Sequence, residues 1–216
     1  MKSIKFFAAI AALVAPFTAA QAVQGLNGAY YVGNYPAPTS GTPAATFITN
    51  TVCFPGCGYD TGDGVALSTF LGVPQGYTTN LSNELPYDYV GNHALTLSGF
   101  INSTGTHSFG LYSDDGSRLY IDGNLIVDNS GQHSPSLITA NNVSLSSGFH
   151  SILIYQDENG GGTALTAYMD GNALSGSVLS TVGNVPEPAT WGLMIGGFGV
   201  VGAVSRRRRA VTTVTA

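Results

Sequence analysis

The sequence predicts an all-β protein whose core is an antiparallel β-sandwich. Short runs in which apolar and polar residues alternate recur along the chain, for example at 94–98, 107–111 and 150–154. A period of two residues is typical of half-buried strands. Gly, Ser, Thr and Asn separate these runs, and no apolar pattern with a period of 3.6 residues persists over three turns. Short strands joined by such turns are expected of a β-sandwich.

The first 22 residues have the composition of a secretory signal peptide. Two lysines precede an apolar run, and the segment ends in Ala20-Gln21-Ala22, which fits an A-x-A cleavage site. We therefore expect residues 1–22 to be removed and the mature chain to lie outside the cytoplasm.

Residues 23–172 are numerous enough to form one domain with its own core. We expect no internal repeat, because no segment recurs at a fixed period. Between residues 36 and 89 Pro, Gly and Thr dominate, so long loops are expected there. Residues 173–185 are expected to be a linker, and residues 210–216 a short tail.

The charge distribution excludes several classes of partner. Arg118 is the only Lys or Arg between Lys5 and Arg206, and all 12 acidic residues lie in this interval, which gives a formal charge of −11 there. Nucleic acids, phosphates and anionic lipids are bound through basic side chains, so they are not expected as partners. A hard cation suits such a surface, although acidic surfaces also serve solubility.

The segment Tyr112–Asn129 combines a predicted β-hairpin with two adjacent carboxylates. Two alternating apolar runs flank Asp122-Gly123, and this dipeptide supplies the positive φ of a type I′ turn. Asp114 and Asp115 precede the first run. Neighbours on a regular strand point to opposite faces, so these carboxylates converge only on a distorted backbone, such as a cis peptide stabilised by a divalent cation. A solvated turn is the alternative.

Cys53 and Cys57 are the only cysteines, and Pro55-Gly56 lies between them. In a secreted chain we expect a disulfide that closes a small loop, since no second Cys or His pair follows at zinc-ligand spacing.

The sequence contains no catalytic motif. It lacks G-x-S-x-G, H-E-x-x-H and the P-loop, and it has no lysine beyond Lys5, so the enzymes that depend on these groups are excluded. The four histidines are scattered singly and are expected to be polar strand or loop residues. Only His133 lies beside the Asp114-Asp115 segment, where it is a candidate for lining a site. We expect a non-enzymatic protein.

The segment from Ser113 to Asn129, followed by Gly131 and His133, resembles the signature of the PA-fourteen (protective-antigen type) domain. This family is a β-sandwich found in adhesins, glycosidases, toxins and bacterial surface proteins. Residues 25–31 are similar to the family's opening strand, and residues 148–155 to its late G-x-H strand. The resemblance covers about residues 25–171 and implies the PA-fourteen fold.

The resemblance also implies a ligand. In carbohydrate-binding members a double aspartate, here Asp114 and Asp115, is joined by a cis peptide and holds a calcium ion that coordinates sugar hydroxyls. A second loop completes the calcium shell, which implies a side-chain ligand at Asp157 and carbonyl ligands at Asn159 and Gly161. Glycine stands where some adhesins have a bulky sugar-contacting residue.

The expected function is therefore that of a calcium-dependent, lectin-like module that binds a glycan or exopolysaccharide. A structural biofilm or matrix protein without sugar binding is one alternative. A glycoside hydrolase that uses two carboxylates is a second.

The C-terminus resembles the PEP-CTERM sorting signal over residues 186–209. Pro186-Glu187-Pro188 and Trp191 lead into an apolar segment, which is followed by Arg206, Arg207, Arg208 and Arg209. Such signals are recognised by exosortase, a membrane protease-transpeptidase, so the resemblance implies sorting to the cell envelope and surface.

The apolar segment at 189–204 is expected to be a short transmembrane helix. A helix of this length spans about 24 Å at 1.5 Å per residue, less than the ~30 Å bilayer core. A transient inner-membrane anchor with the arginines on the cytoplasmic side is therefore expected. An ordinary single-pass tail anchor is the alternative.

Overall fold

The computed structural model describes residues 23–33, 41–57, 65–86, 92–183, 195–199 and 201–202. The expected signal peptide lies outside these residues, as does most of the expected sorting segment. Residues 195–199 and 201–202 are helical. Among the described residues, no helix is both long enough and apolar enough to cross a membrane. Residues 22–184 form one compact unit, which is described below.

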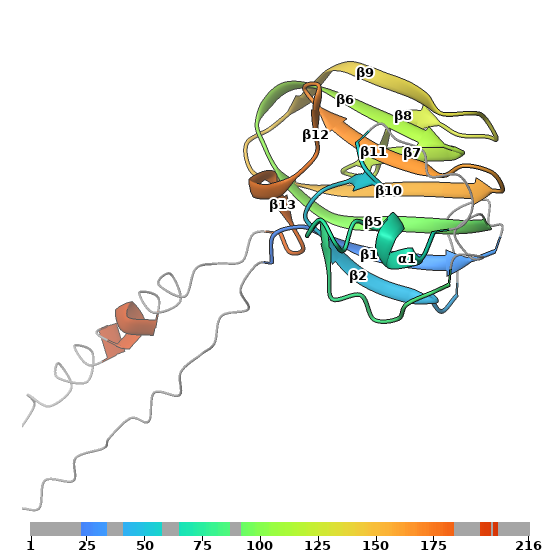
Figure 1. Cartoon of the computed structure of the whole chain (residues 1–216). Helices are drawn as coiled ribbons and strands as arrows, with labels where there is room; N and C mark the ends of the chain where they lie inside the picture. The colour runs from blue at the N-terminus through green and yellow to red at the C-terminus, as the bar shows by residue number, and fades with distance from the viewer. Residues whose placement is uncertain are drawn as a thin grey trace, which may run out of the picture. The chain divides into compact units, whose positions relative to one another are not determined.

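This unit is a sandwich of two antiparallel sheets, as the sequence predicts (Figure 1). The larger sheet contains β1 (Leu26–Val32), β2 (Ala45–Thr49), β4 (Thr78–Thr79), β5 (Asn92–Asn102), β7 (Gly116–Ile121), β8 (Asn124–Asn129), β10 (Phe149–Asn159) and β13 (Leu179–Ser180). The smaller sheet contains β3 (Cys53–Phe54), β6 (Gly105–Asp114), β9 (Ser136–Leu145), β11 (Ala164–Met169) and β12 (Asn172–Ala173).

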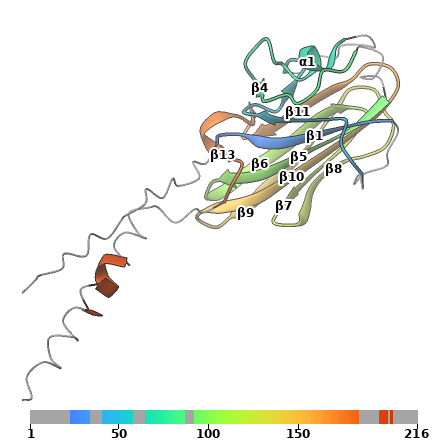
Figure 2. The same ribbon diagram turned by 90° about the horizontal axis from the view of Figure 1, so that it is seen from below.

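The strand order is β4-β2-β1-β5-β10-β7-β8 in the larger sheet, where β13 also pairs with β5. In the smaller sheet it is β12-β11-β6-β9, and β3 also pairs with β11. The long strands of both sheets run in roughly the same direction (Figures 1 and 2), as in aligned sandwiches.

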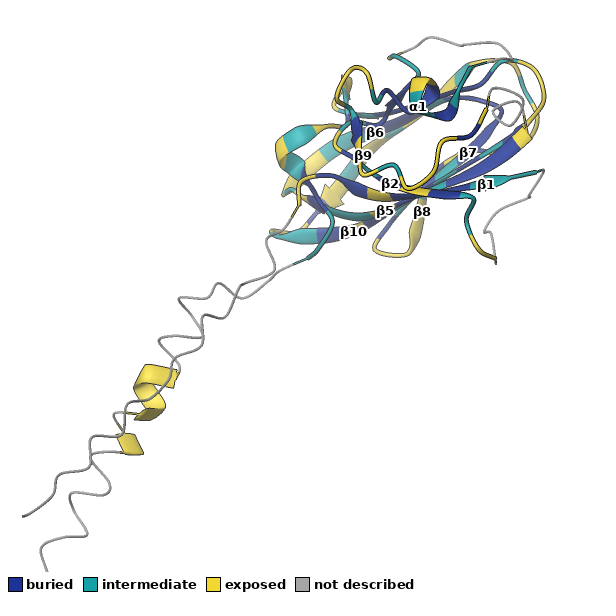
Figure 3. Ribbon diagram, turned by 60° about the horizontal axis from the view of Figure 1, so that its bottom comes forward, coloured by how far each residue is buried: buried dark blue, intermediate teal, exposed yellow. Residues whose placement is uncertain are grey.

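Alternation along the strands produces the core between the sheets. On β10, Ile152 and Ile154 are buried, whereas Ser151 is exposed and Tyr155 is half-buried on the outer face. Figure 3 shows the same change between buried and more exposed residues along neighbouring strands. Each large apolar side chain buried in this way stabilises the fold by about 1.5–3 kcal/mol.

Two regions differ from the expectation of loops and linkers. Between residues 36 and 89 the structure describes β2, β3, β4 and the short helix α1 (Leu67–Phe70), and Cys53 is bonded to Cys57 in a disulfide. The segment expected to be a linker continues the domain as far as Gly183, because Leu174 and Leu179 are buried and β13 pairs with β5. The apolar residues of this segment do not alternate regularly with polar ones, so the sequence does not predict a strand there.

The predicted hairpin is β7–β8. Asp122 and Gly123 have φ values of 49° and 77°, as the central residues of a type I′ turn require. Ile121 faces Asn124 across the turn.

The strands from β5 to β12 form an internal repeat, contrary to the expectation from the sequence. The first unit comprises β5–β8 and the second β9–β12. The pairing of β6 with β11 matches that of β10 with β7, since Phe109 faces Met169 as Ile152 faces Ile121. Each unit has a His-Ser dipeptide near the start of its second strand and an Asp-Gly-Asn turn after its third.

The repeat has no fixed period, which hides it in the sequence. His150 follows His107 by 43 residues, whereas Asp170 follows Asp122 by 48. Of the five additional residues, two extend β10 beyond the length that β6 has after its histidine, and three lie in the connection between β10 and β11. The two units therefore do not align without a gap.

Two histidine–aspartate pairs join one unit of the repeat to the other at the same end of the sandwich. Nδ1 of His150 lies 2.6 Å from Oδ2 of Asp122, and Nδ1 of His107 lies 2.7 Å from Oδ2 of Asp170. Each aspartate also accepts a 2.8 Å hydrogen bond from the backbone N–H of the serine after the histidine. These pairs hold the two Asp-Gly-Asn turns against the neighbouring strands.

The pair of His150 and Asp122 predicts that the stability of the domain depends on pH. The hydrogen bond with Asp122 raises the pKa of His150, and the same bond lowers the pKa of Asp122. The contribution of His150 is fully present below about pH 6.5 and is lost as the pH rises through its raised pKa. The contribution of Asp122 is present above about pH 3.8 and is lost as the pH falls through its lowered pKa.

We therefore expect His150→Asn to lower the free energy of unfolding by about 1 kcal/mol. The effect is modest because Asp122 is partly exposed and solvent screens its interaction with His150. The cost should be largest between about pH 4 and 6.5 in urea unfolding. Asp122→Asn should cost a similar amount, and the double variant little more than either. Additive costs in the double variant would contradict a direct interaction.

Candidate functional site

Asp114 and Asp115 lie where β6 gives way to β7, at the end of the sandwich opposite the histidine–aspartate pairs. The peptide bond between them is cis. Both side chains are only 8% exposed, so the segment is not the solvated turn considered as an alternative.

Two backbone amides orient the Asp115 carboxylate. The N–H of His133 donates to Oδ1 at 2.8 Å, and the N–H of Asn159 donates to Oδ2 at 3.1 Å. Asp115 thereby connects the chain after β8 to the end of β10. The predicted Asn159 is thus beside the aspartate pair.

Gln156 holds the same region together from the interior. Its Nε2 donates to the Asp114 carbonyl at 2.9 Å and to Thr163 Oγ1 at 3.1 Å, and its Oε1 lies 3.1 Å from His93 Nε2. The side chain is fully buried. No motif identifies Gln156, but its position at even spacing after Ile152 and Ile154 places it on the inward face.

Glu158 is the residue of this site that the sequence analysis does not identify. Its side chain is fully buried, and neither carboxylate oxygen accepts a hydrogen bond from the part of the chain that the structure describes. Burial raises its pKa to about 8, and the charges of Asp115 and Asp114 add to the rise. The backbone amides of Asp115 and Gly160 lower the pKa but do not reach hydrogen-bond geometry.

Asp157 lies on the outer face of the sheet rather than the inner one. It is opposite Gly116 on β7, and a Cβ at Gly116 would lie 2.9 Å from Asp157 Oδ1 and 3.0 Å from the backbone N of Gly131. Burial raises the pKa of the Asp157 carboxyl against the lowering effect of Arg118, and the charge of Asp115 adds to the rise. Asp157 is therefore near the pair but approaches it from another side than Glu158.

His133 contributes its backbone and its charge. Its Nδ1 lies 2.9 Å from the Ser134 carbonyl and its Nε2 lies 3.0 Å from the Asn129 carbonyl. Burial lowers its pKa, but these carbonyls and the nearby aspartates outweigh burial, and the pKa is raised. Since both ring nitrogens face acceptors, the ring is arranged as a cation rather than as a ligand.

The remaining predicted ligand, Gly161, lies in the exposed turn after β10 with φ +101°. Within the described residues, no three His, Cys, Asp or Glu side chains are grouped so that they could hold a metal ion. Any ion here would therefore need main-chain oxygens in addition to carboxylates.

The His107–Asp170 pair, together with a nearby serine, has distances like those of a catalytic triad. Ser103 Oγ lies 2.9 Å from His107 Nε2, whose Nδ1 faces Asp170. However, Nε2 also lies 3.1 Å from the Thr104 carbonyl, and in the equivalent position of the repeat His150 Nε2 faces only the Ser146 carbonyl at 2.9 Å. Both histidines share the hydrogen bond to the aspartate of an Asp-Gly-Asn turn, which holds that turn in place. Ser103 is therefore not assigned a catalytic role.

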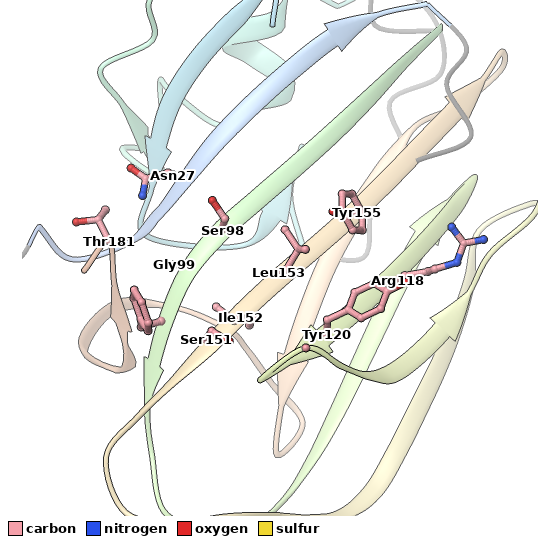
Figure 4. Close-up of a pocket in the computed structure, with 12 residues that line it drawn as sticks. Asn27, Ser98, Gly99, Arg118, Tyr120, Ser151, Ile152, Leu153, Tyr155 and Thr181 are labelled. Atoms are coloured by element: carbon pink, nitrogen blue, oxygen red, sulfur yellow. The ribbon is translucent and has the colours of Figure 1, made fainter. Parts of the chain in front are cut away.

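A groove of about 690 Å³ lies on the outer face of the larger sheet. Tyr120 and Tyr155 meet in it edge to face with ring centroids 5.9 Å apart, and Arg118 lies beside them (Figure 4). Tyr155 is two residues before Asp157 on the same face of β10. The groove thus begins next to the carboxylate site.

Two family models match parts of the chain. The model of the PA14 domain matches residues 83–168, and that of the PEP-CTERM protein-sorting motif matches residues 184–209. The chain carries a PA14 domain and a PEP-CTERM sorting motif. The PA14 match covers the whole first unit of the repeat. It covers the second unit only in part, since it ends before β12. No curated protein sequence matches the chain.

Solved structures support the PA14 fold. The PA14 domain of the MpAFP antifreeze protein is 24% identical with a TM-score of 0.63, over 77% of this chain and 95% of that one. The PA14 sugar-binding domain from an RTX adhesin is 21% identical with a TM-score of 0.55, over 73% and 94%. The Epa9A domain from Candida glabrata, in complex with Galb1-3GlcNAc, is 12% identical with a TM-score of 0.51, over 77% and 93%.

Gln156 gives a prediction about the support of the PA14 site. Gln156→Leu should destabilise the domain by about 3 kcal/mol, because it leaves the buried Asp114 carbonyl and Thr163 hydroxyl without this donor. Leu153→Gln, on the outer face of the same strand, should cost less than about 1 kcal/mol. Chemical unfolding of the two variants measures both values, and equal costs would contradict the role of Gln156.

Proposed function

We propose that the PA14 domain is a calcium-dependent carbohydrate-binding module of the cell envelope. The observation that supports it best is the buried Glu158 carboxylate, which accepts no hydrogen bond within the described residues and lies beside Asp114 and Asp115. A buried carboxylate without a donor is costly, and a bound cation supplies the missing partner.

The ligand chemistry favours calcium among the cations. Calcium takes six to eight oxygen ligands, about 2.3–2.6 Å away, from carboxylates, main-chain carbonyls and water in variable geometry. Asp114 and Asp115 would provide carboxylates, and the carbonyls of Asn159 and Gly161 would provide main-chain oxygens. Glu158 would add a third carboxylate by moving toward the ion, because the three side chains are not grouped around one point in the described residues. Magnesium demands stricter geometry, and zinc favours His and Cys ligands, which the aspartate pair lacks.

When bound, calcium supplies open coordination positions for hydroxyl groups. Residues of this chain position it: the amides of His133 and Asn159 hold Asp115, and Gln156 holds the main chain of Asp114. Vicinal sugar hydroxyls are neutral, so they suit a site whose surroundings carry one arginine and many carboxylates. The sugar-binding name of the RTX adhesin domain is consistent with this assignment.

We place this module at the cell surface by its sorting motif. Exosortase would act on the segment around Pro186-Glu187-Pro188 after a transient stay in the inner membrane, and the PA14 domain would be released outside. No catalytic role is needed for this function.

Two neighbouring carboxylates on β10 allow a sharp test of the calcium site. Glu158→Gln should reduce calcium affinity at least tenfold in titration calorimetry, while the metal-free melting temperature stays close to that of the original chain, since glutamine keeps the size of the side chain. Asp157→Asn, the matched control one residue away, should reduce affinity less. A larger loss in Asp157→Asn would return the side-chain ligand to Asp157, and unchanged affinity in both variants would contradict the site.

Sugar binding is tested separately. On a glycan array the chain should bind a subset of glycans with calcium present, and a chelator should remove the signal. Asp114→Asn/Asp115→Asn should bind no glycan in either condition. Glycan signals that persist with chelator would place recognition elsewhere, for example in the tyrosine groove.

A further inference from the structure

Strand β9 forms an open edge of the smaller sheet. It pairs with β6 on one side, from Ser136 opposite Ser113 to Leu145 opposite Gly105. On its other side no strand pairs with it in the part of the chain that the structure describes. Figure 1 shows β9 at the border of the sandwich.

The other three sheet edges among the described strands are protected. β4 and β12 are only two residues long, so they offer little backbone for pairing. β8 is longer but carries Asp128, whose Oδ1 lies 3.4 Å from Arg118 Nε. Short edge strands and charged edge residues are the usual protection against pairing with other chains.

β9 has neither protection, although a β-bulge at Asn141 and Asn142 interrupts its pairing with β6, and Asn142 has φ 60°. It is 10 residues long, and its sequence SLITANNVSL contains no charged residue and no proline. Leu137 is 54% and Ile138 is 44% exposed, which makes them two of the few exposed large apolar residues of the domain.

The internal repeat shows what such an edge accommodates. β9 is equivalent to β5, because Thr139 faces Gly110 on β6 as Ser98 faces Leu153 on β10. The other edge of β5 is occupied by β1, which pairs with it in antiparallel orientation from Asn27 to Val32. In the smaller sheet no described strand occupies the place equivalent to β1.

We propose that β9 is a self-association edge, on which β9 of a second copy pairs in antiparallel orientation. A second copy is the partner that best fits, since it presents an edge of the same length that is equally uncharged. Antiparallel pairing of identical strands has two-fold symmetry and closes as a dimer. The smaller sheets of two copies then become continuous, and the outer side chains Leu137 and Thr139 of each copy are covered.

This pairing leaves the proposed calcium site of each copy in place and does not depend on it. The interface of a single strand pair is small, so the dimer is expected to be weak in dilute solution and to form where copies are concentrated. Exported copies sorted to one surface meet that condition.

A single-cysteine scan of the full chain tests the proposal directly. Cys53 and Cys57 are bonded to each other and no described cysteine is free, so an introduced cysteine reports on its own position. Residues opposite each other on antiparallel strands have Cα atoms about 4.5–5.5 Å apart, within the range of a disulfide. A cysteine two residues from the two-fold axis does not face the same cysteine of the other copy. The two introduced cysteines are then four residues apart along the strand direction, which is about 13 Å.

We therefore expect Ile138→Cys, Thr139→Cys, Asn141→Cys and Ser144→Cys to differ sharply under mild oxidation, and Asn142 is left unchanged because its φ of 60° does not suit a cysteine. One position, or two neighbours, should give at least fivefold more disulfide-linked dimer than the rest. Asn124→Cys on the β8 edge is the control and should give little. Equal yields at all positions, or no dimer at any β9 position, would overturn the proposal, and position dependence separates strand pairing from association through the C-terminal segment.

A charge on the edge gives the second test. Leu137→Lys should reduce the dimer yield of the best cysteine variant at least fivefold, because a lysine on an edge strand opposes pairing with another chain. Leu125→Lys on β8, which is 47% exposed, is the matched control and should leave the yield unchanged. Both substitutions are at the surface, and unchanged circular dichroism melting confirms folding. An unchanged dimer yield in Leu137→Lys would also overturn the proposal.

Discussion

The candidate site depends on the burial of neighbouring carboxylates. Asp114, Asp115 and Glu158 gather at one end of the sandwich, and the charges of the two aspartates raise the pKa of Glu158. Both oxygens of Asp115 accept hydrogen bonds from backbone amides, those of His133 and Asn159, whereas neither oxygen of Glu158 accepts one from the described residues. Carboxylates buried in this way repel one another, and the protein offers little positive charge to offset them. The proposed cation would supply that charge.

The two ends of the sandwich therefore differ in whether their acidic side chains are paired with histidines. At one end, each histidine donates to an aspartate, and the charges are paired within the protein. At the other end, the acidic residues lie close to one another, and neither oxygen of Glu158 accepts a hydrogen bond from the described residues. Strands β6 and β10 connect the two ends, since each has a histidine near its start and an acidic residue at or near its end.

Much of the fold follows from the sequence because it rests on local patterns. Alternation identifies β5, β6 and β10 but not β9, and Asp122-Gly123 identifies the hairpin, since both signals come from residues that are close in the chain. β3, β13 and the repeat do not follow. Short strands have too few residues to establish alternation, and the repeat is interrupted by the longer connection between β10 and β11, which removes any fixed period.

Glu158 shows the limit of reasoning from motifs and also the value of strand parity. Motif resemblance leads to Asp157, because the loop after β10 is read without reference to the faces of the strand. The alternation of Ile152 and Ile154 already fixes even-numbered residues as inward, which places Gln156 and Glu158 inside and Asp157 outside. Glu158 also stands eight residues after His150, as Asp115 stands eight after His107. The two units of the repeat thus bring an acidic residue to the same depth, and they differ in that the backbone satisfies Asp115 and leaves Glu158 without a donor.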